Sequence, residues 1–345
     1  MPYYKPLKEI KDVVTKQRII DKLLFLRTKL DAEIPSKTYS ETLLLATWNI
    51  REFGGNREAE SLHYLAEIAS RFDLIAIQEV SADLTGLERL LYLMGKNWDY
   101  IVTDSTEGTA GGNERIAFVY DTDKISFQKI AGEIVLPENM LIVDKHQIAR
   151  TPFCVAFQAG WFKFVLTSVH IYFGTETGEK YKRRVAEIAK LAEFLSKRAT
   201  KEDKNYILLG DFNITDTKAD TMKALTDSGF IVPEELQKHP SNIMKTKHYD
   251  QIAFKVKEDT NMRIFNKTQQ KAGAFSFYDV VFKDDEMPIY RHLFTPQNTD
   301  GKTEEKITDY YQDKWRTFQM SDHLPLWVEL KVDFSNQYLE SLKKI

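Results

Sequence analysis

The sequence is poor in cysteine, with Cys154 as the only one among 345 residues. A single thiol excludes a disulfide framework within the chain, and one thiol among seven histidines gives no structural zinc pattern. Long apolar stretches are missing too, since no run approaches the ~18 residues of a membrane-spanning helix. The first residues, MPYYKPLKEIKD, lack the apolar segment and cleavage site of a secretory signal. We therefore expect a cytoplasmic protein with no membrane span.

An excess of charge of either sign is also absent. The chain has 48 basic and 51 acidic residues, which give a net charge of −3. No overall positive field attracts a polyanionic partner, so any contact with nucleic acid must be local. With 43% hydrophobic and 12% aromatic residues, the chain can bury the core of one large α/β sandwich or of two ordinary domains. The composition leaves the oligomeric state open.

The first 40 residues predict an amphipathic helix bounded by prolines. Between Pro6 and Pro35, apolar residues recur mostly three or four positions apart, with lysines and acidic residues between them. These apolar residues are Leu7, Ile10, Val14, Ile20, Leu23, Leu24 and Leu30. We interpret residues 1–40 as an N-terminal extension whose apolar face packs on the rest of the protein, with packing on a partner chain as the alternative.

From residue 43 onward, strand and helix patterns follow one another. Some expected strands are separated by helices and others are adjacent, which favours mixed sheets with helices outside over a purely parallel sheet. The expected strands are 43–50, 74–80, 115–120, 152–158, 163–172, 206–213, 249–254 and 325–332, and the expected helices are 57–70, 84–94, 180–199 and 217–228. We expect one domain over residues 41–335 and a tail at 336–345. Within the domain, the polar segment 258–320 is interpreted as long loops or an insertion with short strands.

Polar side chains stand where many of these strands begin or end. In the stretch YILLGDFNIT, a buried-strand pattern runs through Gly210 into Asp211 and Asn213. Comparable positions are held by Asn49 and Arg51, Gln78 and Glu79, His170, Asp250, and Asp322 and His323. Each of these alone is an ordinary turn, core or solvated residue. Because binding groups collect where strand ends meet in layered α/β folds, the whole set favours one shared cleft.

This set of side chains indicates a particular chemistry. Carboxylate and amide oxygens without thiolates suit Mg²⁺ or Mn²⁺, which are typically held by one or two carboxylates and a substrate phosphate. Two histidines can act as base and acid, each with a partner that fixes its tautomer. A metal ion, a polarised water and a proton for the leaving oxygen are what hydrolysis of a phosphate ester requires.

Short motifs along most of the chain resemble those of a known family. They are WNIREFGG (48–55), IQEV (77–80), NERIAFVY (113–120), RTPF (150–153), SVH (168–170), VAEI (185–188), LLGDFN (208–213), YDQI (249–252) and SDHLPL (321–326). These motifs follow one another in the family's order. The sequence therefore resembles the endonuclease/exonuclease/phosphatase superfamily, and within it the deoxyribonuclease I branch. The resemblance implies a four-layer α/β sandwich, with two mixed β-sheets packed face to face, helices outside and a catalytic site at one rim.

The resemblance also implies a role for each matched residue. Glu79 is the principal metal ligand, with Asn49 and Asp322 in its inner or water-mediated shell. Asp211 and Asn213 orient the nucleophile and hold the scissile phosphate. His323 backed by Asp250 is the general base, His170 backed by Glu114 protonates the leaving oxygen, and Arg150 and Arg51 contact substrate phosphate.

The chain departs from the deoxyribonuclease I pattern outside these residues. Gly112 and Ser81 stand where that branch has side chains that probe the minor groove, and the family disulfides are absent. The glycine-rich stretch EGTAGGNER (107–115) lacks a GK[ST] sequence, so we interpret it as a strand connection and not as a phosphate-binding loop.

Three functions are compatible with this pattern. The first is a metal-dependent nuclease acting on DNA, or on RNA instead, and the second is a phosphatase or phosphodiesterase for a small or lipid-linked phosphate. The third is a catalytically silent binding module. A silent module would have lost at least one of the four central residues Glu79, His170, Asp211 and His323, and all four are present. The sequence therefore favours an enzyme.

Overall fold

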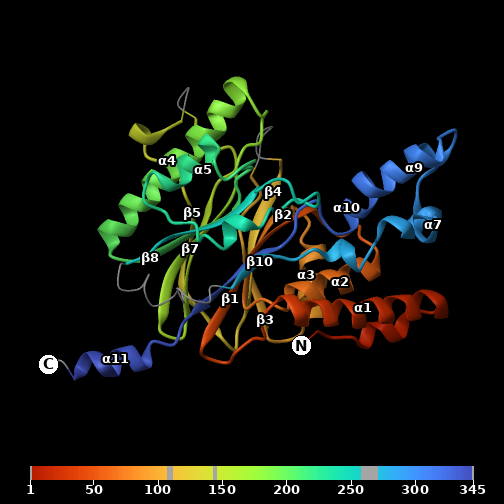
Figure 1. The fold of residues 1–345 in the computed structure, drawn as a ribbon, viewed down its shortest axis with the longest axis horizontal. Coiled ribbons are helices and arrows are strands. Elements are labelled where there is room, and N and C mark those ends of the chain that lie inside the picture. Colours follow the sequence, from red (N-terminus) through yellow and green to blue (C-terminus); the bar gives the residue numbers. More distant parts are fainter. Residues whose placement is uncertain (1, 107–111, 143–145, 258–270, 344–345) are drawn as a thin grey trace.

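The computed structural model describes residues 2–106, 112–142, 146–257 and 271–343. Two mixed β-sheets lie face to face, and helices cover their outer faces (Figure 1). This architecture confirms the four-layer sandwich that the sequence predicts. Part of the glycine-rich segment 107–115, the start of the 258–320 segment and the end of the tail lie outside the described residues.

The two sheets, here called sheet A and sheet B, contain both parallel and antiparallel neighbours. Pairs β1/β2 and β7/β8 are parallel, and the other neighbouring strands are antiparallel. Sheet A consists, in order, of β10 (Ala272–Ala274), β11 (Leu326–Lys331), β1 (Thr42–Phe53), β2 (Leu74–Ser81), β4 (Glu114–Asp121) and β3 (Trp98–Val102). Sheet B consists of β5 (Ile125–Glu133), β6 (Phe153–Ala159), β7 (Phe162–His170), β8 (Asn205–Asp211) and β9 (Asp250–Lys255).

Helices α1, α2 and α3 pack on the outer face of sheet A, and α4 and α5 pack on sheet B (Figure 1). The longer ones agree with the sequence prediction to within a few residues. The helices are α1 (Val13–Glu33), α2 (Ala59–Ala69), α3 (Thr85–Met94), α4 (Gly178–Glu202), α5 (Asp220–Thr226), α7 (Met287–Tyr290), α8 (Pro296–Thr299), α9 (Glu304–Tyr310), α10 (Arg316–Gln319) and α11 (Ser335–Leu342).

The central strands are apolar on both faces because each face is covered. In β1, Leu43 and Leu45 belong to the core between the two sheets, whereas Leu44 and Ala46 belong to the core under the sheet A helices. Successive side chains of a strand point to opposite faces, so a continuous apolar run fills both cores. Burying each leucine contributes roughly 1.5–3 kcal/mol, which holds the layers together.

The strand register brings the polar strand ends to one rim of the sandwich. In sheet B, His170 at the end of β7 is the register partner of Asp211, and Asp211 is the partner of Asp250 at the start of β9. In sheet A, Asn49 is the partner of Gln78. Helix α4 connects the parallel strands β7 and β8, so both strands end at the same edge.

The N-terminal segment forms two elements in place of the single helix predicted. A 3₁₀-helix, η1 (Lys5–Glu9), precedes α1, and Asp12 caps α1 by accepting a 2.7 Å hydrogen bond from the Thr15 amide. The buried side chains of α1 are Ile19, Leu23, Leu26 and Leu30. They pack on the protein itself, as predicted, but Val14 and Leu24 of the predicted apolar face are exposed.

The sequence predicts long loops or an insertion with short strands at 258–320, but residues 271–320 are mostly helical, with β10 as the one strand there. The prediction of long loops is therefore wrong for these residues. Their aromatic side chains are buried together and join the core of sheet A, most clearly Tyr290, Phe294, Tyr311 and Trp315. Short helices let these rings face inward while the lysines and acids face water. Besides α7 to α10, the segment contains η5 (Phe277–Asp279), η6 (Asp284–Glu286), η7 (Arg291–Leu293) and the π-helical turn η8 (Tyr311–Trp315).

Strands β3 and β5 were not predicted. Both lie at sheet edges, and most of their side chains are partly or fully exposed, which weakens the apolar signal of a strand. Within the described parts of the chain, we find no helix with the length and apolar character required to cross a bilayer.

Gly210, next to Asp211 in β8, has a φ of +130°, and a Cβ atom there would lie 2.1 Å from the carbonyl oxygen of Val169. We expect Gly210→Ala to lower the free energy of unfolding by about 3 kcal/mol or more, because the backbones of β7 and β8 must separate. Urea unfolding followed by circular dichroism measures the change. Gly132→Ala in β5 is the control, since a Cβ atom there meets nothing within 4 Å. Equal destabilisation by both changes would contradict the expectation.

Candidate active site

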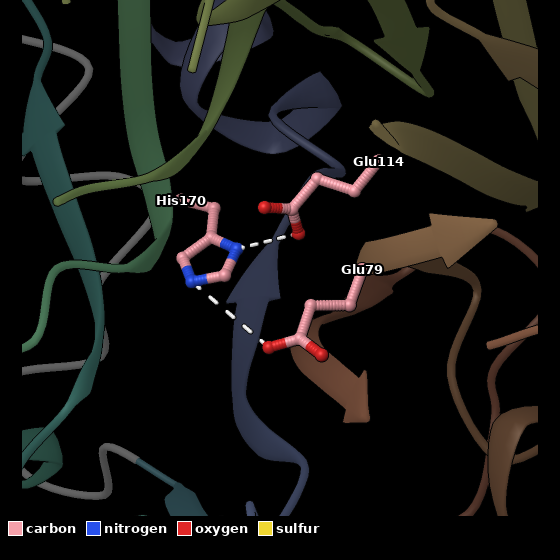
Figure 2. Close-up of side chains that lie close together, drawn as sticks. All are labelled: Glu79, Glu114 and His170. Carbon is pink, nitrogen blue, oxygen red and sulfur yellow. Dashed lines mark hydrogen bonds and ion pairs between the residues drawn. The ribbon is translucent and has the colours of Figure 1, made fainter. Parts of the chain in front are cut away.

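Strands from both sheets deliver the predicted residues to the rim. Glu79 in β2 and Glu114 at the start of β4 come from sheet A, and His170 at the end of β7 comes from sheet B. Figure 2 shows the His170 ring with one nitrogen directed at each of the two carboxylates. The site is therefore assembled across the gap between the sheets.

His170 is held by Glu114. The Nδ1 atom of His170 lies 2.8 Å from Glu114 Oε2, and the Nε2 atom lies 3.5 Å from Asp211 Oδ2 and 4.0 Å from Glu79 Oε1. Burial alone would lower the pKa of His170, but the charge and hydrogen bond of Glu114, together with the charge of Asp211, outweigh it and the pKa is raised. Because Nδ1 is occupied, Nε2 is the nitrogen available for proton transfer.

His323 is held in the same way by Asp250. Its Nδ1 atom lies 2.7 Å from Asp250 Oδ2, and its Nε2 atom lies 3.7 Å from Asp211 Oδ2. The backbone of His323 is fixed as well, since its carbonyl accepts a 2.9 Å hydrogen bond from the Trp48 indole. Burial would lower the pKa of His323, but Asp250 and Asp211 raise it well above the usual value. Two imidazoles therefore face one buried carboxylate.

The turn after β8 orients Asp211. The backbone amide of Asn213 donates a 2.8 Å hydrogen bond to Asp211 Oδ1, so that Asp211 Oδ2 faces the histidines. Asn213 has a φ of +53°, a conformation that asparagine tolerates better than most residues. Its side-chain Nδ2 donates to the Ile171 carbonyl at 2.8 Å, so Asn213 also ties the ends of β7 and β8 together.

Glu79 is positioned by two donors from β1. Its Oε1 accepts a 2.9 Å hydrogen bond from Asn49 Nδ2, and its Oε2 accepts one of 2.9 Å from the Glu52 amide. Burial raises the pKa of Glu79, but His170, the Glu52 amide and Asn49 outweigh burial, and the pKa is lowered. Glu79 is therefore a charged carboxylate at neutral pH.

The oxygen atoms around Glu79 fit a hard divalent cation. Asn49 donates through Nδ2 to both Glu79 and Asp211, and its buried Oδ1 has no hydrogen-bond partner among the described residues. Ligand atoms of Glu79, Glu114 and His170 lie within 4.8 Å of one another, but Glu114 is already bonded to His170. An unpaired amide oxygen beside a charged carboxylate is the donor set that Mg²⁺ and Mn²⁺ prefer.

Asp322 lies at the same rim. Its half-buried carboxylate accepts no hydrogen bond from a described residue, and its charge contributes to the raised pKa of His323. Its predicted part in the metal shell remains a prediction.

The two arginines predicted to bind phosphate have different partners in the structure. Arg150 forms an ion pair with Glu114 and lies beside the cluster. Arg51 instead points toward α10, where its Nη1 atom donates to Thr317 Oγ1 at 2.6 Å and to the Asp313 carbonyl at 3.3 Å. The predicted contact of either arginine with phosphate is untested.

A cleft of about 580 Å³ opens beside Glu79 and Glu114. Among the described residues, its lining is acidic, with four carboxylates and a single arginine, Arg150. It also contains Gly112 and Ser81, the positions where the resemblance to the deoxyribonuclease I branch implies that groove-probing side chains are missing. The lining residues are Glu52, Gly54, Gly55, Asn56, Glu79, Ser81, Asp83, Gly112, Asn113, Glu114, Arg150 and Phe318.

Sequence reasoning gave no role to two buried residues that support the site. Gln78 is fully buried and donates a 2.8 Å hydrogen bond across the sheets to Ser168 Oγ. Arg184 of α4 is also fully buried and donates to the Asn213 carbonyl at 2.5 Å. A signal for Arg184 is present in the sequence, since it continues the buried stripe of Ile188 and Leu191.

Known structures share this fold. An endonuclease/exonuclease/phosphatase family protein from Bacteroides thetaiotaomicron superposes with a TM-score of 0.53 at 17% identity, over 86% of this chain and 98% of that chain. A mannosyl-6-phosphatase from the same species gives 0.50 at 17% identity, over 84% and 99%. The human Nocturnin catalytic domain with bound sulfate gives 0.51 at 15% identity, over 84% and 94%.

Sequence comparison identifies the family. Among curated proteins there is no match to the chain. The profile described as the endonuclease/exonuclease/phosphatase family, however, matches residues 46–278, which include Asn49, Glu79, His170, Asp211 and Asp250. The chain therefore belongs to the endonuclease/exonuclease/phosphatase family, a family of hydrolases that act on phosphoester bonds.

Proposed function

We propose that the protein is a Mg²⁺-dependent phosphodiesterase, with Mn²⁺ as a substitute ion, and that it acts on nucleic acid. One observation carries the proposal. The Nε2 atoms of His170 and His323 lie 3.5 Å and 3.7 Å from the same Asp211 Oδ2 atom, and each Nδ1 atom is held by a separate carboxylate. Two oriented proton-transfer groups thus flank one point where a water molecule and a phosphate ester can meet.

The chemistry needs one proton removed and one delivered. His323, backed by Asp250, takes the proton of a water molecule that Asp211 orients, and the water oxygen forms a bond to phosphorus. The bond from phosphorus to the leaving oxygen breaks, and His170, backed by Glu114, gives that oxygen a proton. Both histidine pKa values are raised, so the pKa directions do not distinguish base from acid. The division of roles needs a kinetic test.

Glu79, Asn49 and Asp322 are the residues that we propose to hold the metal ion. A bound divalent cation supplies positive charge that neutralises the phosphate oxygens as negative charge develops. Members of the family typically depend on a divalent metal ion, and the unpaired Asn49 Oδ1 atom and the charged Glu79 carboxylate support the assignment here.

The substrate is proposed to be DNA, with RNA as the alternative nucleic acid. A second candidate is a small phosphate ester, and the acidic cleft favours it. In the part of the lining that the structure describes, four carboxylates against one arginine repel a chain of phosphates, whereas one phosphate at Arg150 is compatible with them. The similarity in fold to a mannosyl-6-phosphatase is in line with this candidate.

Metal dependence is the first expectation. EDTA should abolish hydrolysis, and Glu79→Gln should weaken binding of Mn²⁺ and lower activity while the far-ultraviolet circular dichroism stays unchanged. Glu193→Gln is a matched control, since this glutamate pairs with Lys190 and Lys197 on α4, away from the rim. Full activity of a metal-stripped sample in EDTA would refute the metal assignment.

The roles of the histidines can be separated with a nitrophenolate ester, whose leaving group needs no proton. We expect His170→Ala and His323→Ala each to lower kcat on an ordinary ester by ~10²–10⁴, the usual value of one proton transfer. The nitrophenolate ester should restore most of the activity of His170→Ala but not of His323→Ala. Rescue of His323→Ala alone would reverse the two assignments. Wild-type rates for both variants on an ordinary ester would exclude the two histidines as the proton-transfer groups.

The substrate class follows from comparing rates on supercoiled plasmid, single-stranded DNA, RNA, a generic phosphodiester and sugar phosphates. A nuclease should cleave at least one nucleic acid faster than the small esters. Because its contacts would be made mainly to phosphate, cleavage should slow steeply with added salt. Fast release of phosphate from a small ester, with no cleavage of nucleic acid, would instead establish the second candidate.

A further inference from the structure

Arg57 is a buried arginine that the proposed chemistry does not use. The residue is 5% exposed, and its guanidinium carbon Cζ lies over two aromatic rings, 5.1 Å from the centre of Phe53 and 5.0 Å from that of Phe318. Its guanidinium donates to two consecutive backbone carbonyls, at 3.0 Å from Nη1 to Glu52 and also from Nη2 to Arg51. A planar guanidinium is suited to holding two acceptors in a fixed geometry.

The two carbonyls belong to an irregular part of β1. The pairing of β1 with β2 shifts register between Asn49 and Phe53, and within the shift Glu52 has a φ of +46°. This conformation is unfavourable for a residue other than glycine, so it persists only where surrounding contacts impose it. Its consequence is specific, because the Glu52 amide then donates a 2.9 Å hydrogen bond to Glu79 Oε2.

Helix α10, in the segment first interpreted as a polar insertion, holds the same region. Thr317 accepts a hydrogen bond from Arg51 at 2.6 Å, and the Phe318 ring lies over Arg57. Gln319 Oε1 accepts from the Glu58 amide at 3.0 Å and from Ser61 Oγ at 2.8 Å, at the start of α2. Three consecutive α10 residues thus contact Arg57 and the chain before and after it.

We propose that Arg57 is a positioning residue for the metal ligand Glu79. Arg57 fixes the Arg51 and Glu52 carbonyls. The backbone held in this way keeps the Glu52 amide in place, and this amide orients the Glu79 carboxylate. Helix α10 holds Arg57 in place through Phe318. This inference rests on the proposed role of Glu79 as metal ligand, and it assigns to residues 317–319 a part in metal binding at a distance.

The test is binding of Mn²⁺ alone to the full chain, measured by electron paramagnetic resonance of the free ion. Replacing a residue that orients a metal ligand typically weakens metal binding about 10- to 100-fold, and we expect a loss of this size for Arg57→Met. In kinetics, the Mn²⁺ concentration for half-maximal rate should rise by a similar factor, whereas kcat at saturating Mn²⁺ should change far less.

Arg18→Met is the matched control. Arg18 is a partly buried arginine that contacts α2 through Glu60 at 3.1 Å. It also lies 5.3 Å from the centre of the Tyr290 ring, but it has no contact with the Glu52 region. It should keep wild-type affinity for Mn²⁺ even if its melting temperature falls as much as that of Arg57→Met. An equal loss of affinity in both variants would mean that Arg57 acts only through stability, and the proposal would be wrong.

Two further variants cover the case that Arg57→Met does not fold and test the metal assignment separately. Arg57→Lys keeps the positive charge without the planar fork, so its affinity should lie between those of the wild type and Arg57→Met. If Arg57→Met does not fold, affinity of Arg57→Lys within twofold of the wild type overturns the proposal. Glu79→Gln distinguishes the positioning role of Arg57 from the metal-ligand role of Glu79. Loss of Mn²⁺ binding in Glu79→Gln with full binding in Arg57→Met removes only the positioning role, whereas full binding in Glu79→Gln removes the metal assignment itself.

Discussion

The hydrogen bond from Asn49 to Asp211 joins the two sheets at the centre of the site. Asn49 belongs to sheet A and Asp211 to sheet B, and the Nδ2 to Oδ2 distance is 3.1 Å. Both side chains are almost fully buried. The same Asn49 Nδ2 atom reaches Glu79, and the same Asp211 oxygen faces both histidines. Every proposed role of the site therefore depends on the spacing and register of the two sheets.

Assembling so many ionisable groups below the surface has an electrostatic cost. Removing one charge from water costs several kcal/mol in a protein, unless a partner or hydrogen bonds offset it. Here neighbouring groups offset the cost of burying each charge. Glu114 holds His170, Asp250 holds His323, and backbone amides hold Glu79 and Asp211. The two apolar cores stabilise this arrangement because they fix the strands from which these side chains extend.

Part of this protein could be predicted from the sequence. Continuous apolar runs such as ILLG and LIAI predict strands buried on both faces, and those strands form as expected. Polar residues at the strand ends predict a common cleft, and the predicted pairs His170 with Glu114 and His323 with Asp250 both form. The prediction works because side-chain alternation and strand termini are local properties, and because the motifs follow the family's order.

Other features were decided only by the tertiary structure. Helical burial of residues 271–320 depends on aromatic rings that meet only in the folded chain, and edge strands such as β5 have too little apolar pattern to be recognised. Arg51 was predicted at the phosphate, yet its side chain contacts Thr317 of α10, a partner 266 positions away. The sequence gives no sign of Arg57, because its partners are backbone carbonyls. It places Gln78 at a strand end but gives it no specific role, because its partner is a hydroxyl group on the other sheet. The sequence by itself determined which side chains stand at strand ends, since that follows from local periodicity. Their distances, pKa values and supporting contacts depend on how distant segments pack, which no local pattern encodes.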